Sequence, residues 1–197
     1  GCNVIFTTSP TFSQASLKAA IANPKITILN CSLHDPHTSM RTYYARMHEA
    51  KFIMGAVAGS MAAHDKIVYI ADYPIYGTIA NINSFAQGVK MTNPRAKIHL
   101  LWSCLKDVDV EEQIKQLQPD CVSDKDLSVP EAGTRYYGLY MSYPDSIWNL
   151  AIPIYNWGKF YEQLIEAILN GTWKADDSKN VKAINYWWGM AENAIEV

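Results

Sequence analysis

Acidic, aromatic and hydroxyl side chains follow several short apolar runs of this sequence. They are Thr8, Ser9, Asp72, Tyr73, Trp102, Ser103, Asp124, Tyr140 and Ser142. An aromatic face can stack on a flat apolar group, and carboxylates and hydroxyls can accept hydrogen bonds from a polar one. Together, such side chains suit a cleft that holds a small molecule.

The sequence lacks the patterns expected of a catalyst. It contains no nucleophile elbow, no glycine-rich phosphate loop and no Ser-His-Asp order. Asp124 and Asp126 could act as paired carboxylates, but neighbouring acids in a loop are usually solvated. We therefore predict that the protein is not an enzyme, and an enzyme stays a distant alternative.

A group of metal-ligating residue types occurs at Cys31, His34, Asp35 and His37. The spacing matches no zinc pattern, and a second ligand pair is missing. We interpret these residues as a polar loop and predict no metal and no cofactor. The four cysteines form no CxxC pair and are typical of small buried residues.

Composition excludes two classes of partner. The chain has 197 residues, 49% of them hydrophobic, with 17 basic and 19 acidic residues and no basic stripe. Nucleic-acid binding is therefore not expected. Apolar stretches are interrupted by charged residues, His or Pro well before the roughly 18 residues that a membrane span needs. Residues 1–10 show no signal-peptide pattern.

Apolar runs alternate with helical patterns along the chain. Strands are expected at residues 3–7, 26–30, 67–71, 98–102, 120–123, 136–141, 149–153 and 183–188. Helices are expected at residues 12–22, 44–63, 78–92, 110–117 and 156–169. This alternation predicts βαβ units with parallel sheets, which bind ligands at the carboxyl ends of their strands.

Three stretches resemble the basic membrane protein family, a branch of the type I periplasmic-binding fold. They are YYARMHEAKFIMG at residues 43–55, KIVYIADYP at 66–74 with NSFAQGV at 83–89 and TNP at 92–94, and NLAIPIYNWGKFY at 149–161. Their order and spacing cover most of the chain and make the match fairly specific.

The resemblance implies a two-lobed α/β fold with parallel sheets flanked by helices. Lobe 1 would comprise residues 1–70 plus 150–172, and lobe 2 residues 71–149 plus 173–197. Family members begin with two further strand–helix units, so we expect the first lobe to be incomplete. A fragment of this kind could self-associate through its exposed surface.

The resemblance also implies a function. Members are extracytoplasmic substrate-binding lipoproteins of ABC-type importers, so the expected ligand is a purine-type nucleoside or similar molecule held between the lobes. The expected partner is an ABC permease, with a lipid anchor outside this chain. The alternative is a ligand-sensing regulatory domain of a larger membrane-associated protein; a nucleoside-processing enzyme is more distant.

The family pattern assigns ligand contacts to specific residues. Phe12 would stack on the base, although it could instead pack on the core face of its helix. Asp72, before Tyr73, would accept hydrogen bonds from sugar hydroxyls, although it could instead cap a helix. The full set of expected ligand-binding residues is Ser9, Phe12, Asp72, Tyr73, Trp102, Asp124, Tyr140, Asn156 and Trp157. Trp157 could equally be a packing residue of a hinge.

One departure from the family leaves the ligand open. Where members have a Gly-x-Asp-x-Asp strand end that binds the sugar, this chain has Tyr140 and Ser142 in place of the two acids. The family's Gly-Gly loop is also missing, and Asp124 stands in that region. A different aromatic or sugar-like ligand is therefore a second expectation.

Overall fold

The computed structural model describes residues 1–33, 37–125, 133–143, 145–172 and 185–197. By internal contacts, the chain divides into two compact units. Unit 1 comprises Gly1–Arg46 and Tyr155–Ile195, and unit 2 comprises Met47–Ile154 and Glu196–Val197. The chain therefore passes from one unit to the other three times.

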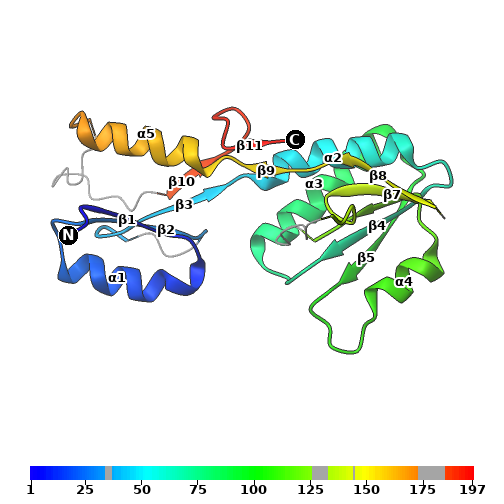
Figure 1. The fold of residues 1–197 in the computed structure, drawn as a ribbon, viewed down its shortest axis with the longest axis horizontal. Helices are drawn as coiled ribbons and strands as arrows, with labels where there is room; N and C mark the ends of the chain where they lie inside the picture. Colours follow the sequence, from blue (N-terminus) through cyan, green and yellow to red (C-terminus); the bar gives the residue numbers. More distant parts are fainter. Residues whose placement is uncertain (34–36, 126–132, 144, 173–184) are drawn as a thin grey trace. The chain divides into compact units, whose positions relative to one another are not determined.

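Unit 1 is a parallel sheet with a helix on each face (Figure 1). Its strand order is β1-β2-β3-β10, with bounds Val4–Thr7, Thr27–Cys31, Arg41–Ala45 and Asn185–Trp188. The helices are α1, Ser13–Ala22, preceded by a 3-10 turn at Pro10–Phe12, and α5, Trp157–Leu169. Ile28 packs in the core with Ala20 of α1, and its neighbour Leu29 packs with Phe160 of α5. Burial on both faces explains why β2 is an almost continuous apolar run.

Unit 2 is a mixed five-stranded sheet, in the order β5-β4-β6-β7-β8. The strand bounds are β4, Lys66–Ala71; β5, Lys97–Trp102; β6, Cys121–Ser123; β7, Leu139–Tyr143; and β8, Ser146–Ala151. Strand β4 is parallel to β5 and β6, whereas β7 is antiparallel to β6 and β8. Helices α2, Met47–Met61, and α3, Tyr76–Thr92, share a core with the sheet, and α4, Val110–Leu117, packs in a second core cluster.

Glycines bring α2 and α3 into close contact. A Cβ atom on Gly55 would lie 2.1 Å from the carbonyl oxygen of Phe85, and one on Gly88 would lie 2.0 Å from that of Phe52. Both distances are far below van der Waals contact. Glycines in α2 and α3 therefore allow the backbones of the two helices to pack closely.

Two short strands, β9 at Ile154–Tyr155 and β11 at Ile195–Glu196, form a separate two-stranded sheet. They lie where the chain changes unit. The backbone N–H of Asn156 donates to Ala194 O at 3.0 Å and continues this pairing.

Most predicted elements occur within a few residues of their expected bounds, but strand β3 was not predicted. Residues 41–45 form strand β3 instead of entering a helix from residue 44, because Tyr43 packs against Phe160 in the core of unit 1. The expected parallel pairing occurs in both sheets, and β7 and β8 add antiparallel pairs to the sheet of unit 2. Only two residues separate these strands. A connection this short allows antiparallel pairing but is too short for the crossover that a parallel pair needs.

The bounds of the two compact units differ from the bounds of the expected lobes. The first change of unit falls at Arg46–Met47 and not at residues 70–71, because α2 packs on α3 and shares a core with β4. Residues 173–184 of the expected second lobe lie outside the described part of the chain. The lobe assignment as a functional division stays a prediction.

Candidate ligand-binding site

The carboxyl ends of β4, β5 and β6 bring three polar residues to one edge of the unit 2 sheet. Asp72, Ser103 and Asp124 each follow the last residue of one of these strands. The Ser103 N–H donates to Ala71 O at 2.9 Å, and the Ser103 hydroxyl donates to Asp72 Oδ1 at 2.9 Å. We call Asp72, Ser103 and Asp124 the carboxylate edge.

The second carboxylate oxygen of Asp72 is a buried acceptor. Asp72 Oδ2 has no hydrogen-bond partner among the described residues. Asp72 does not cap α3, whose N-cap residue is Ile75. Since buried polar atoms are nearly always hydrogen-bonded, this oxygen is suited to receive a donor from outside the unit.

Asp124 is held by backbone contacts on both sides. Its N–H donates to Gly138 O at 2.8 Å, and its Oδ1 accepts from the Lys125 N–H at 2.7 Å. Burial raises the pKa of Asp124, and the negative charge of Asp72 raises it further. The Lys125 N–H and the charges of Lys125 and Lys51 oppose this rise in pKa. The two carboxylates are thus close enough to affect each other.

Tyr73 and Trp102 flank this edge with different exposure. Tyr73 directly follows Asp72 and is 61% exposed, so its ring is accessible to a ligand. Trp102 ends β5 and packs partly buried against the core that includes Phe85 and Met141. Tyr73 is therefore the more accessible aromatic side chain.

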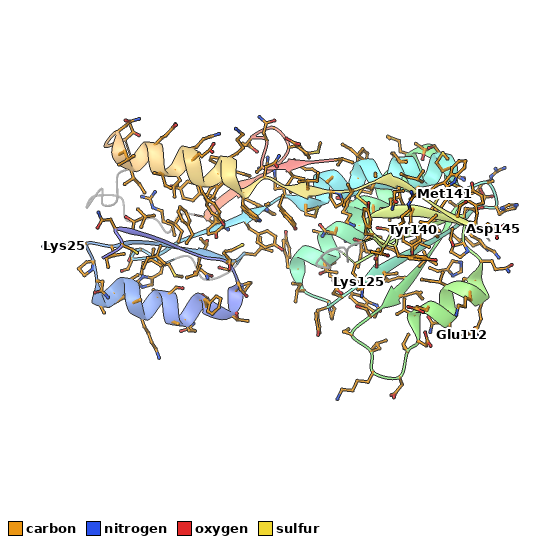
Figure 2. All side chains as sticks on the ribbon, viewed as in Figure 1. Lys25, Glu112, Lys125, Tyr140, Met141 and Asp145 are labelled. Atoms are coloured by element: carbon orange, nitrogen blue, oxygen red, sulfur yellow. The ribbon has the colours of Figure 1, made fainter. Side chains whose placement is uncertain are left out.

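Tyr140 is the second residue of β7 (Figure 2). It pairs with Val122, is 4% exposed and packs with Val68 in the core cluster that α4 covers. Burial raises the pKa of its phenol. Because β7 runs antiparallel to β6, its first residue is the one nearest the carboxylate edge. A contact of Tyr140 with a ligand stays a prediction.

The carboxyl end of β1 in unit 1 carries Ser9 and Phe12. Ser9 Oγ accepts from the Thr11 N–H at 3.3 Å, and Ser9 O accepts from the Phe12 N–H at 3.1 Å. These bonds hold the turn that ends at Phe12, whose side chain is 50% exposed. Phe12 therefore presents a large part of its ring to the surroundings instead of burying it in the core.

Asn30, which the sequence analysis missed, fixes this turn from β2. Its Nδ2 donates to Thr7 Oγ1 at 2.8 Å and to Ser9 O at 2.9 Å. Since a carbonyl oxygen can only accept, these bonds identify the remaining atom as Oδ1. That oxygen is buried without a partner among the described residues, as is Ser13 Oγ at the start of α1. The sequence signal that could have identified Asn30 is an amide near the end of an otherwise apolar strand.

Asn156 and Trp157 begin α5 on the aromatic side of unit 1. The Trp157 ring is stacked on Tyr155 at 5.5 Å and meets the Tyr43 ring edge-on at 5.4 Å. Asn156 is the N-cap residue of α5, but its side chain makes no capping bond. These contacts are those of a packing residue, and a contact of Trp157 with a ligand stays a prediction.

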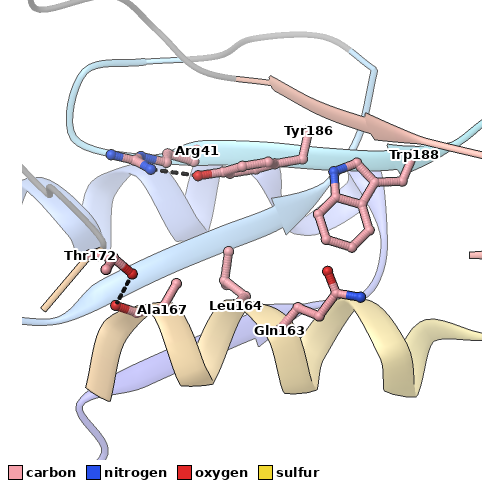
Figure 3. Close-up of a pocket in the computed structure, with 7 residues that line it drawn as sticks. All are labelled: Arg41, Gln163, Leu164, Ala167, Thr172, Tyr186 and Trp188. Atoms are coloured by element: carbon pink, nitrogen blue, oxygen red, sulfur yellow. Dashed lines mark hydrogen bonds between the residues drawn. The ribbon is translucent and has the colours of Figure 1, made fainter. Parts of the chain in front are cut away.

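Two cavities in the described part of the chain are lined by none of the expected ligand-binding residues. One, of about 250 Å³, lies between α5, β3 and β10 in unit 1 (Figure 3) and is lined by Arg41, Gln163, Leu164, Ala167, Thr172, Tyr186 and Trp188. Arg41 begins β3, so the cavity reaches the end of the sheet opposite to Ser9. A second, of about 590 Å³, lies between α4 and β5 in unit 2.

The described residues contain no group of three His, Cys, Asp or Glu side chains that could hold a metal ion. His34, Asp35 and Asp126 lie outside the described residues. Burial raises the pKa of the Cys31 thiol to about 11, which suits a packing role more than a reactive one.

The fold and the polar strand ends define an α/β protein of the ligand-binding class. The sequence model of the PnrA-like ABC transporter substrate-binding proteins matches residues 1–114. This is more than half of the chain, and the chain belongs to this family. The resemblance found in the sequence is thereby confirmed.

Two curated relatives match nearly the whole chain. A purine-binding protein of Brucella abortus is 25% identical over 212 residues, which cover 100% of this chain and 58% of the relative. The ABC transporter glucose-binding protein TsgA13 of Haloferax volcanii, so named provisionally, is 24% identical over 95% of this chain and 49% of its own length. The chain thus spans about half the length of these relatives.

Solved structures share the fold at low identity. An ABC transporter solute-binding protein from Conexibacter woesei aligns with a TM-score of 0.67 at 13% identity, covering 100% of this chain and 68% of that one. A transcriptional activator of the comK gene from Bacillus halodurans aligns with a TM-score of 0.62 at 12% identity, covering 100% and 70%. These likenesses confirm the α/β fold class.

Proposed function

We propose that this chain is the ligand-binding part of an ABC importer's substrate-binding protein, and that it holds an uncharged nucleoside without altering it. The observation that carries the proposal is the carboxylate edge, where the buried Asp72 Oδ2 has no partner among the described residues. Family membership supplies the class of protein, and the edge supplies the chemistry of the ligand.

A carboxylate pair selects ligands by charge. Asp72 and Asp124 can accept hydrogen bonds from hydroxyl or amino groups, as a ribose and a base provide. A phosphate would bring like charges together in a partly buried site, which is unfavourable. We therefore expect nucleosides to bind better than nucleotides, with Tyr73 or Phe12 as an aromatic face for the base.

A monosaccharide is the second candidate. Its hydroxyls would satisfy the same acceptors, and one relative is named as glucose-binding. A purine is preferred because another relative is named as purine-binding and because the exposed rings of Tyr73 and Phe12 suit a flat base.

In the cell, the proposed partner is an ABC permease, and the proposed place of action is outside the cytoplasm, with a lipid anchor in the intact protein. No helix in the described part of the chain is long and apolar enough to cross a membrane. The described loops at the strand ends carry polar side chains suited to binding a ligand. We propose no catalytic step.

The proposal is tested by thermal-shift screening followed by calorimetry. The 197-residue chain is titrated with adenosine, guanosine, inosine, uridine, AMP and glucose. A nucleoside at 100 times its Kd should raise the free energy of unfolding by about 2.7 kcal/mol.

The panel also separates the candidates. AMP is the matched control for adenosine, because it adds only a phosphate, and it should bind much more weakly. Stabilisation by glucose alone would favour the monosaccharide. No stabilisation by any nucleoside or by glucose would contradict the proposed ligands.

A further inference from the structure

We infer that unit 1 binds an internal water molecule between α1 and its sheet, where the water bridges the side chains of Asn30 and Thr42. The site belongs to unit 1 alone, and its existence does not depend on which ligand the protein holds. Both residues are part of a layer of small polar side chains under α1.

The face of α1 that packs on the sheet is polar in its first turns. The buried residues of α1 are Ser13, Ser16 and Ala20. They recur at intervals of three and four residues and so share one face of the helix. Ala20 packs with Ile28 and Met40 in an apolar cluster. A helix usually covers a sheet with apolar side chains, so the two buried serines indicate a local polar layer.

The sheet presents polar residues to the same face of α1. In register, Thr7 of β1 is opposite Asn30 of β2, which is opposite Thr42 of β3. Asn30 lies two residues after Ile28, and Thr42 lies two residues after Met40. Since side chains alternate along a strand, Asn30 and Thr42 face α1 as their predecessors do. Both are 0% exposed.

Hydrogen bonds within the protein satisfy one side of this layer. Thr7 Oγ1 lies 3.0 Å from Ser16 Oγ and accepts from Asn30 Nδ2 at 2.8 Å. Asn30 Nδ2 also donates to Ser9 O at 2.9 Å. The amide hydrogens of Asn30 are thus directed to β1 and the turn that follows it. Because β2 lies between β1 and β3, this leaves Asn30 Oδ1 on the side of β3.

Three oxygens of the layer are buried without a partner among the described residues: Asn30 Oδ1, Thr42 Oγ1 and Ser13 Oγ. Buried polar atoms are nearly always hydrogen-bonded. Neighbouring strands lie about 4.8 Å apart, and two hydrogen bonds of about 2.8 Å through one water span such a distance. The water donates to Asn30 Oδ1 and shares a second hydrogen bond with the Thr42 hydroxyl, and it takes the space that short side chains leave.

A ligand is a poorer occupant of this place than water. Asn30 and Thr42 lie inside strands and are closed off from solvent, whereas Asp72 follows the end of its strand and is partly exposed. Metal ions such as Ca²⁺ and Mg²⁺ take carboxylate ligands, and the three unpartnered oxygens belong to one amide and two hydroxyls.

Through Asn30, the water supports the turn that ends at Phe12. Ser9 O accepts from Asn30 Nδ2 and from the Phe12 N–H. A hydrogen bond to Asn30 Oδ1 fixes the orientation of the whole amide and therefore the bond to Ser9.

The test replaces the Thr42 hydroxyl by a methyl group of nearly the same size. With a bound water, Thr42→Val removes one of its partners and should raise the unfolding equilibrium constant of the 197-residue chain about fivefold or more. Urea denaturation measures this. Thr27→Val, a half-buried position on β2, is the matched control and should change the constant by less than about threefold. An unchanged or lower constant in Thr42→Val would mean that its hydroxyl has no partner to lose, and this would overturn the inference.

A high-resolution crystal structure locates the water directly. We expect density for one water within hydrogen-bond distance of Asn30 Oδ1 and Thr42 Oγ1. A direct bond between the two side chains, or no water between them, would overturn the inference. If Thr42→Val does not fold, the wild-type crystal structure decides alone. Neither measurement uses a ligand, so both are independent of the nucleoside panel.

Discussion

At the scale of single residues, Asp72 combines one satisfied and one unsatisfied carboxylate oxygen. Ser103 donates to Oδ1, while Oδ2 is buried without a partner among the described residues. Leaving a buried acceptor unpaired costs about 1–3 kcal/mol, and more when it is charged. A ligand hydroxyl or amino group would recover that energy on binding.

Substituting Asp72 should therefore weaken binding without weakening the fold. Asp72→Asn keeps the size of the side chain and an acceptor for Ser103, but it replaces the free acceptor by a donor. We expect the affinity for the best nucleoside of the panel to fall about tenfold or more, from the loss of a charged hydrogen bond. Isothermal titration calorimetry measures this.

Asp107→Asn is the matched control, because Asp107 is an exposed residue that follows β5. It removes the same charge and should leave affinity unchanged. Equal loss of affinity in both variants would mean that net charge, and not the Asp72 acceptor, controls binding.

At the scale of elements, the position of α2 depends on its contact with α3. Gly55 and Gly88 let the two backbones touch, and Thr92 Oγ1 donates to Ala56 O at 2.9 Å across the same contact. The carboxyl-terminal part of α2 is thereby fixed against the helix that follows β4, and its amino-terminal part carries Lys51. Packing at these glycines helps to place the lysine.

Gly55→Ala should destabilise unit 2. Its Cβ would lie 2.1 Å from the Phe85 carbonyl oxygen, so the helices would have to separate. Overpacking of this kind costs about 1–3 kcal/mol. Urea denaturation followed by circular dichroism measures the loss.

Gly158→Ala gives the comparison within a helix that has room. No atom lies within 4 Å of a Cβ at Gly158 in the first turn of α5. This variant should be neutral or more stable by up to about 1 kcal/mol, since alanine favours a helix over glycine. Gly55→Ala behaving like Gly158→Ala would contradict the close packing of α2 and α3.

At the scale of the whole chain, acid stability depends on Asp120, which joins the starts of β4 and β6. Asp120 Oδ2 accepts from the His64 N–H at 3.0 Å and the Lys66 N–H at 3.1 Å, and Oδ1 lies 2.7 Å from His64 Nδ1. Burial alone would raise the pKa of Asp120, but the hydrogen bonds from His64 and Lys66 outweigh it and lower the pKa. These residues are more than fifty positions apart, so the bonds form only on folding.

The lowered pKa predicts how stability changes with pH. A carboxyl group that is more acidic in the folded state contributes its full stabilisation above its unfolded pKa, near 3.8, and loses it as the pH falls through the folded value. Asp120→Asn removes this titration. Between about pH 5 and pH 3, the free energy of unfolding should therefore fall less steeply in the variant than in the wild type.

Urea denaturation of both proteins across this range measures the difference, with Asp107→Asn as an exposed control. Parallel loss of stability in wild type and Asp120→Asn would show that other carboxyl groups govern acid unfolding.

The sequence by itself determined the fold class, the family and most elements. Alternating apolar runs and helical patterns identified β1, β2, β4, β5 and β6 because each strand is at least partly buried and a polar residue follows each of them. The same pattern brought Asp72 and Asp124 to one edge, since parallel strands share a carboxyl end.

Only the tertiary structure decided the direction of β7, the strand at residues 41–45 and the environment of Lys51. Local sequence cannot give strand direction, which depends on pairing partners, and it did not show that Tyr140 is buried. Nor can it tell which buried group a side chain on a helix will meet across the chain. The sequence analysis did not single out Lys51 and Asn30. Their contacts with Ser123 and Ser9 form only when the chain has folded.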